Sequence, residues 1–145
     1  MNIGILGSAA NPPHNGHIAI GEYVRTHMPL DRILFIPGYI PPSKGILAVS
    51  PKHRFRMAKR AVNHLPSWSV SDIEIRKKGV SYTHDTIAEL KKKYPHDSLF
   101  WIVGLDNMLS MDEWKGGYGL LDECQFIVVP RVFYSFDSIP SAIRK

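Results

Sequence analysis

The chain has 145 residues, of which 44% are hydrophobic and 21% charged, and 18 Lys and Arg against 13 Asp and Glu give a formal net charge of +5. These values are ordinary for a globular protein, so they exclude a chain too polar to bury a core and predict one domain over residues 1–145. The positive charge suits anionic small molecules, and the basic residues lack the interleaved aromatic residues that are typical of RNA binding.

Cys124 is the single cysteine, so an internal disulfide is excluded and a buried thiol is expected. The N-terminus lacks a basic segment before an apolar stretch, and no apolar run is long enough to span a membrane. We therefore expect a cytoplasmic protein with neither a membrane nor nucleic acid as partner. The sequence is compatible with a homo-oligomer.

Short apolar runs alternate with segments of helical periodicity along the chain. The predicted strands are residues 3–6, 33–36, 99–103 and 126–129, and the predicted helices are residues 15–27, 51–65, 83–94 and 119–124. Strands that are apolar along their whole length are typical of a parallel sheet covered on both faces. The pattern predicts an α/β fold, Rossmann-like, with three layers (α/β/α) and a mainly parallel sheet. Ligands are expected at the carboxyl ends of the strands.

The segment after the first strand, residues 7–17, reads G-S-A-A-N-P-P-H-N-G-H. His14 and His17 fall one turn apart at the start of the helix predicted over 15–27, and residues three apart share a helix face. A helix N-terminus attracts anions, and two imidazoles can donate hydrogen bonds to phosphoryl oxygens. Gly16 would let a phosphate approach the backbone closely. This pattern favours a phosphate site, and a helix start without a ligand is the alternative.

The next strand is followed by a loop rich in Pro and Gly, residues 36–45, in which Lys44 can hold a positive charge over a cleft or can simply be exposed. Ser50 and Pro51 then form a good helix start, with Ser as N-cap and Pro at the first helical position.

The H-x-G-H spacing resembles the signature of the nucleotidyltransferase superfamily. Further segments resemble, in the expected order, motifs of the bacterial nicotinate mononucleotide adenylyltransferase family. They are residues 36–45 (I-P-x-x-x-P-P-H-K), 52–57 (H-R-x-x-M), 81–86 (S-Y-T-x-D-T) and 101–108 with Trp114 (I-G-x-D…W). The resemblance spans residues 3–131, and several matches in order are much more specific than any one of them.

The resemblance implies a HIGH-type nucleotidyltransferase fold and an adenylyltransferase of NAD biosynthesis. In this reaction the 5′-phosphate of nicotinate or nicotinamide mononucleotide attacks the α-phosphorus of ATP, giving the dinucleotide (deamido-NAD from nicotinate mononucleotide) and pyrophosphate. Mg²⁺ would arrive with ATP, because no cluster of Asp, Glu and His with metal-ligand spacing is visible.

The family's site residues transfer to matching positions of this sequence. The implied catalytic residues are His14, His17 and Lys44. The implied nucleotide-binding residues are Gly7, Ser8, Gly16, Gly104, Asp106, Asn107, Arg131, Ser141 and Arg144. The implied mononucleotide-binding residues are Ala9, Lys44, Tyr82, Thr83 and Trp114. Thr83 and Asp106 could instead cap helices, and Trp114 could be a half-buried core aromatic.

Two segments depart from the family pattern. The family's G-G-T-F-D-P loop corresponds here to residues 7–12, in which Ala9 and Ala10 lack the hydroxyl and the aromatic ring, and Asn11 replaces a carboxylate. Residues 138–144 resemble the family's S-S-T-x-I-R motif close to the last residue, where a chain end tends to fray. Three interpretations follow: the C-terminal helical part is truncated, the motif is completed by a neighbouring subunit of a short relative, or triphosphate binding has been lost. The alternatives are a sister transferase that acts on phosphopantetheine or a polyol phosphate, and a non-catalytic nucleotide-binding module.

Overall fold

A parallel β-sheet forms the centre of the computed structural model, which describes residues 1–8, 15–39 and 49–130. Within these residues the strands are β1 (Asn2–Ser8), β2 (Arg32–Pro37), β3 (Trp68–Val70), β4 (Ser98–Gly104) and β5 (Gln125–Val129). They form one sheet in the order β3-β2-β1-β4-β5, and all of the pairings are parallel. The predicted strands and the predicted α/β class are confirmed. β3 was not predicted, because three residues are too few to show a period.

Helices and turns connect the strands. They are α1 (Asn15–His27), α2 (Pro51–Val62), α3 (Ile73–Lys77), α4 (Thr83–Lys93), α5 (Leu105–Met108) and α6 (Leu120–Glu123), with the 3₁₀ turns η1 (Met111–Glu113) and η2 (Gly117–Gly119). The predicted start of α2 is confirmed, because Ser50 Oγ accepts a hydrogen bond from the His53 amide at 3.2 Å. The prediction of α2 over 51–65 was three residues too long, and α3 and α5 were not predicted.

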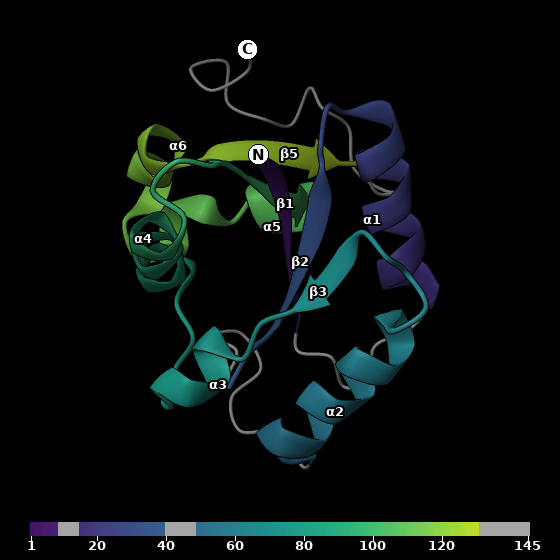
Figure 1. The fold of residues 1–145 in the computed structure, drawn as a ribbon. Helices are drawn as coiled ribbons and strands as arrows, with labels where there is room; N and C mark the ends of the chain where they lie inside the picture. Colours follow the sequence, from purple (N-terminus) through teal and green to yellow (C-terminus); the bar gives the residue numbers. More distant parts are fainter. Residues whose placement is uncertain (9–14, 40–48, 131–145) are drawn as a thin grey trace.

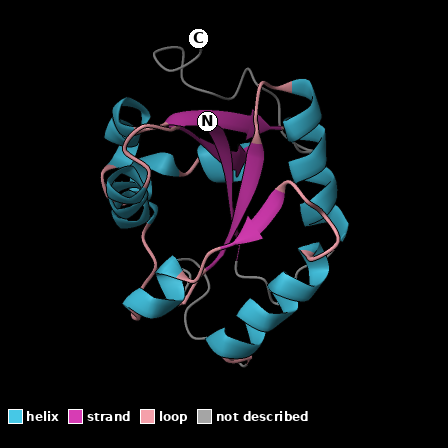
Figure 2. Cartoon of the chain, in the orientation of Figure 1, coloured by secondary structure: helices cyan, strands magenta, loops and turns pink. Residues whose placement is uncertain are grey.

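The helices cover both faces of the sheet (Figures 1 and 2). α1 and α2 lie on one side, and α4 and α6 lie on the other. Alternate residues of β2 belong to different core clusters: Ile33 and Phe35 pack with α1 and α2, whereas Leu34 and Ile36 pack with α4. This two-sided burial is the reason that the strand is apolar along its length.

Among the described residues, no helix has both the length and the apolar character needed to cross a lipid bilayer.

The strand register aligns the carboxyl ends of four strands. Leu6 of β1 pairs with Phe35 of β2 and with Ile102 of β4, and Ile102 pairs with Ile127 of β5. Two residues further along, β1, β2, β4 and β5 end at one edge of the sheet. The strand order reverses between β1 and β4, because the chain leaves β1 toward one face and β4 toward the other. A crevice for ligands is expected at such a point.

Candidate active site

His17 lies in the first turn of α1, at the carboxyl edge of the sheet. Its partly buried ring meets the ring of Phe35 edge-on, with 5.9 Å between the ring centroids and 86° between the ring planes. Gly16 precedes it in the same turn. The N-terminus of this 13-residue helix places the positive end of its dipole beside His17, which suits an anionic ligand.

Several predicted site residues lie outside the described part of the chain. These are His14, Ala9, Lys44, Arg131, Ser141 and Arg144. The pairing of two imidazoles and the phosphate grip at residues 138–144 therefore stay predictions.

Glycines shape the ends of β1 and β4. A Cβ on Gly7 would lie 3.2 Å from the Trp101 indole. Gly104 ends β4, and a Cβ there would lie only 2.7 Å from Asp106 Oδ1, so the Asp106 carboxylate folds back over Gly104. Asp106 lies inside α5, whose N-cap is Gly104, so the alternative that Asp106 caps this helix was wrong.

Asn107 is exposed on α5, one residue beyond Asp106. The predicted residues of β1 and β4, including Ser8, thus lie on adjacent strands at one edge.

The start of α4 is joined to the segment that carries Trp114. Lys115 Nζ donates hydrogen bonds to Asp85 Oδ1 at 2.8 Å and to Oδ2 at 3.1 Å, and it lies 5.3 Å from the centroid of the Tyr82 ring. The hydrogen bonds from Lys115 and then from His84 lower the pKa of Asp85 to about 2. Asp85 is therefore ionised at neutral pH and holds the residue next to Trp114 against α4.

The three residues predicted to bind the mononucleotide here have different environments. Tyr82 is exposed and is the N-cap of α4, and Thr83 is the first residue of the helix. The alternative that Thr83 caps α4 was wrong, because the N-cap makes no side-chain hydrogen bond and lies one residue earlier. Trp114 is half-buried against the core cluster under α4 and α6, as the alternative of a core aromatic anticipated.

Sequence reasoning assigned no role to two charged side chains at this edge. Arg54 and Glu74 have exposed fractions of 1% and 8%. Arg54 falls in the H-R-x-x-M segment, which is a signal for its importance, whereas Glu74 lies outside every segment that resembles a motif of the family. Arg54 contacts residues that follow β2, and Glu74 contacts Ser81 before α4 and Thr86 within it.

No group of three or more His, Cys, Asp or Glu side chains within residues 1–8, 15–39 and 49–130 is arranged to hold a metal ion.

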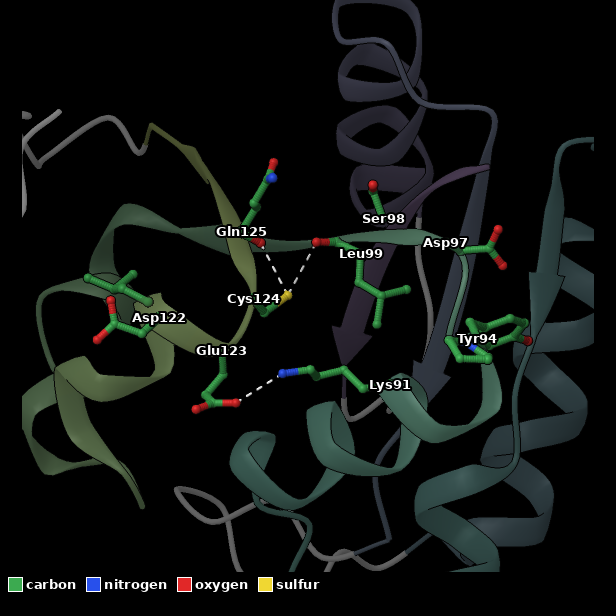
Figure 3. Close-up of a pocket in the computed structure, with 11 residues that line it drawn as sticks. Lys91, Tyr94, Asp97, Ser98, Leu99, Asp122, Glu123, Cys124 and Gln125 are labelled. Carbon is green, nitrogen blue, oxygen red and sulfur yellow. Dashed lines mark hydrogen bonds and ion pairs between the residues drawn. The ribbon is translucent and has the colours of Figure 1, made fainter.

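A pocket of about 360 Å³ lies at the opposite edge of the sheet (Figure 3). It is lined by the first residues of β4 and β5, Ser98 and Gln125, and by Lys91 and Glu123, which form an ion pair at 3.0 Å. Cys124 Sγ donates to the carbonyls of Leu99 and Gln125. Cys124 is buried, so the predicted buried thiol is confirmed. Burial raises its pKa to about 11, which keeps the thiol protonated at neutral pH.

The strand order is that of Rossmann-like nucleotide-binding proteins. Sequence comparison narrows this class: residues 5–144 match the family model described as cytidylyltransferase-like. The chain belongs to the cytidylyltransferase-like family.

Curated relatives carry one name. The chain is 41% identical over 129 residues to the probable nicotinate-nucleotide adenylyltransferase of Carboxydothermus hydrogenoformans. The matching residues cover 89% of this chain and 64% of that relative. It is 39% identical over 132 residues to the protein of the same name from Geotalea uraniireducens, and this match covers 90% of this chain and 61% of that relative. The chain thus spans less than two thirds of the length of these relatives.

A solved structure has the same fold. The Plasmodium falciparum nicotinic acid mononucleotide adenylyltransferase complexed with NaAD superposes with a TM-score of 0.70, covering 94% of this chain and 78% of that chain. The two sequences are 15% identical, so this likeness supports the fold alone.

Proposed function

We propose that this chain transfers the adenylyl group of ATP to nicotinate mononucleotide, which yields the deamido-NAD dinucleotide and pyrophosphate. The observation that carries the proposal is the identity of 41% and 39% to relatives named for this activity, over about nine tenths of the chain. Further support comes from the position of His17, Gly104 and Asp106 at one edge of the sheet.

The chemistry needs alignment more than covalent catalysis. The acceptor phosphate is already a nucleophile, so the protein holds it in line with the leaving pyrophosphate and stabilises the growing negative charge. His17 and the N-terminus of α1 would supply hydrogen-bond donors to that charge, together with His14 and Lys44. ATP would enter with its Mg²⁺, so the metal is part of the substrate.

The two nucleotides would occupy neighbouring parts of the crevice. Gly104 and Asp106 would line the adenosine pocket at the end of β4. Thr83 and Trp114 would hold the pyridine ring, with Tyr82 beside them, because the Asp85–Lys115 contact brings these segments together. Arg131, Ser141 and Arg144 would bind the triphosphate.

Replacing His17 tests the proposal. We expect His17→Ala to lower kcat by about a hundredfold or more, because one preorganised donor to the transition state is removed. The assay couples pyrophosphate release to a colour reaction with ATP and nicotinate mononucleotide. His27→Ala, at the far end of the same helix and exposed, is the matched control and should keep the wild-type rate. A near-normal rate for His17→Ala would contradict the assignment.

The same assay separates the rival functions. A higher kcat/KM with phosphopantetheine or a polyol phosphate would indicate a sister transferase, and a higher value with nicotinamide mononucleotide would change the acceptor. The loss of side-chain groups at Ala9 and Ala10 favours a third possibility, a non-catalytic binding module. That function predicts ATP binding by calorimetry without pyrophosphate release for any acceptor.

A further inference from the structure

Arg54 connects residues that lie on either side of residues 40–48. Its guanidinium donates hydrogen bonds to the carbonyls of Gly38 and Tyr39, the latter at 2.8 Å, and to the carbonyl of Val49 at 3.1 Å. Gly38 and Tyr39 directly follow β2. The buried guanidinium thereby holds the backbone carbonyls of Gly38 and Tyr39 in place after the end of this strand.

Glu74 lies close to Gly38 and is connected to Tyr39 through Ser81. Its Oε2 accepts a hydrogen bond from Thr86 Oγ1 at 2.7 Å, and the Ser81 hydroxyl is a second hydrogen-bond partner. Ser81 Oγ in turn accepts a hydrogen bond from the Tyr39 amide at 2.9 Å. Glu74 Oε1 also lies 3.3 Å from the position that a Cβ on Gly38 would occupy.

These contacts make Glu74 the junction of three segments. Thr86 belongs to α4, Ser81 lies two residues before α4, and Gly38 and Tyr39 follow β2. A buried carboxyl group is costly unless its partners are in place, and a satisfied polar network fixes one arrangement of the groups that it joins. An apolar side chain would fill this space at a smaller cost, so stability alone is a poor reason for a glutamate here.

We propose that Glu74 is a positioning residue of the acceptor site: it holds the start of α4, with Tyr82 and Thr83, against Gly38 and Tyr39 at the end of β2, and so sets the shape of the pocket that receives the mononucleotide. The inference rests on the proposed function, in which Tyr82 and Thr83 contact the acceptor. Glu74 itself touches no substrate in this scheme. Its loss should therefore affect binding of the mononucleotide more than binding of ATP or the chemical step.

Kinetics of Glu74→Ala and Glu74→Gln test this role. We expect Glu74→Ala to raise the KM for nicotinate mononucleotide about tenfold, with kcat and the KM for ATP changed less than about threefold. Glu74→Gln should restore the KM to within about twofold, because its amide can donate to Thr86 and accept from Ser81. Glu22→Ala is the matched control, since Glu22 is also a hydrogen-bonded glutamate, paired with Arg25 and Trp68 on the opposite face of the sheet. It should leave the KM for the mononucleotide unchanged.

Ser81→Ala provides an independent variant if Glu74→Ala fails to fold, because it removes only the hydroxyl between Glu74 and the Tyr39 amide. A rise of about threefold or more in the mononucleotide KM is expected. Amide hydrogen exchange of Tyr39, followed by NMR, should also become faster in both variants. The proposal is overturned if Ser81→Ala leaves the mononucleotide KM and the Tyr39 exchange rate unchanged, or if the KM for ATP rises equally.

Turnover by the wild-type protein distinguishes a failure of this proposal from a failure of the proposed function. Absence of turnover with every mononucleotide would refute the function, and the inference about the acceptor pocket would fail with it. Wild-type turnover with unaltered variants would refute only the role of Glu74.

Discussion

Glu74 carries a carboxyl group that is half-protonated near neutral pH. Burial raises its pKa to about 7, although hydrogen bonds from Thr86 and Ser81 and the charge of Lys77 act in the opposite direction. The other buried charge nearby, Arg54, is directed to backbone carbonyls. The ordinary pKa of a glutamate such as Glu74 is 4.5. Between pH 4.5 and about pH 7, the Glu74 carboxyl group is therefore protonated in the folded protein and ionised in the unfolded chain. The resulting contribution to stability is complete below pH 4.5 and is lost as the pH rises through 7.

Glu74→Gln should therefore remove part of the pH dependence of stability. The free energy of unfolding of Glu74→Gln, relative to wild type, should increase by up to roughly 3 kcal/mol between pH 4.5 and 8, because the amide has no charge to bury. Urea denaturation of both proteins at pH 5 and pH 8 measures the difference. The acid titration of Asp85, near pH 2, lies outside this range. An identical difference at the two pH values would contradict the burial of an ionisable group at this position.

At the scale of elements, α1 and β3 illustrate how a short edge strand is held in place. β3 pairs with β2 through only three residues, and its Trp68 packs against Gly21 of α1 so closely that a Cβ on Gly21 would overlap the indole ring. Trp68 Nε1 also donates a hydrogen bond to Glu22 Oε2 at 3.1 Å. The contact with α1 thus supplements the short ladder of hydrogen bonds.

Gly21→Ala should destabilise the protein by about 1–3 kcal/mol, because overpacking against a rigid ring outweighs the better helix propensity of alanine, which is worth about 1 kcal/mol. Thermal denaturation measures the effect. Gly119→Ala is the matched control: nothing lies within 4 Å of its added Cβ and its φ is −60°. We expect that variant to be neutral or slightly stabilised. Equal stability of the two variants would show that Trp68 can move away from α1.

For the whole molecule, the proposed active site and the pocket of Figure 3 lie at opposite edges of the sheet. The carboxyl edge carries His17, Gly104 and the contacts around Glu74, whereas the pocket of Figure 3 lies at the amino edge. Lys91 and Glu123 in that pocket have side chains that are 48% and 55% exposed. Ion pairs between such exposed groups are weak.

Lys91→Ala and Glu123→Ala should each leave kcat/KM for both substrates within about twofold of wild type and change the free energy of unfolding by less than about 1 kcal/mol. Steady-state kinetics and urea denaturation provide the two measurements. A selective rise in KM for either substrate would place part of the active site at the amino edge.

Local sequence patterns predicted the elements that are long or fully buried. The apolar runs at 33–36 and 99–103 marked central strands, and Ser50 with Pro51 marked the start of α2, because these signals depend on residues only a few positions apart. β3 and α3 escaped notice because three and five residues are too few for a period. The alternative that Thr83 and Asp106 cap helices failed because each cap lies one or two residues earlier.

The sequence by itself determined the parallel α/β fold and the order of its strands and longer helices along the chain, because strand burial and helix starts leave local patterns in residue type and spacing. Only the tertiary structure decided that Glu74, Ser81 and Tyr39 form one network and that Lys115 binds Asp85 beside Tyr82. The reason is physical: whether a charged side chain is buried and satisfied depends on partners that are distant along the chain, and packing alone brings them within hydrogen-bond distance.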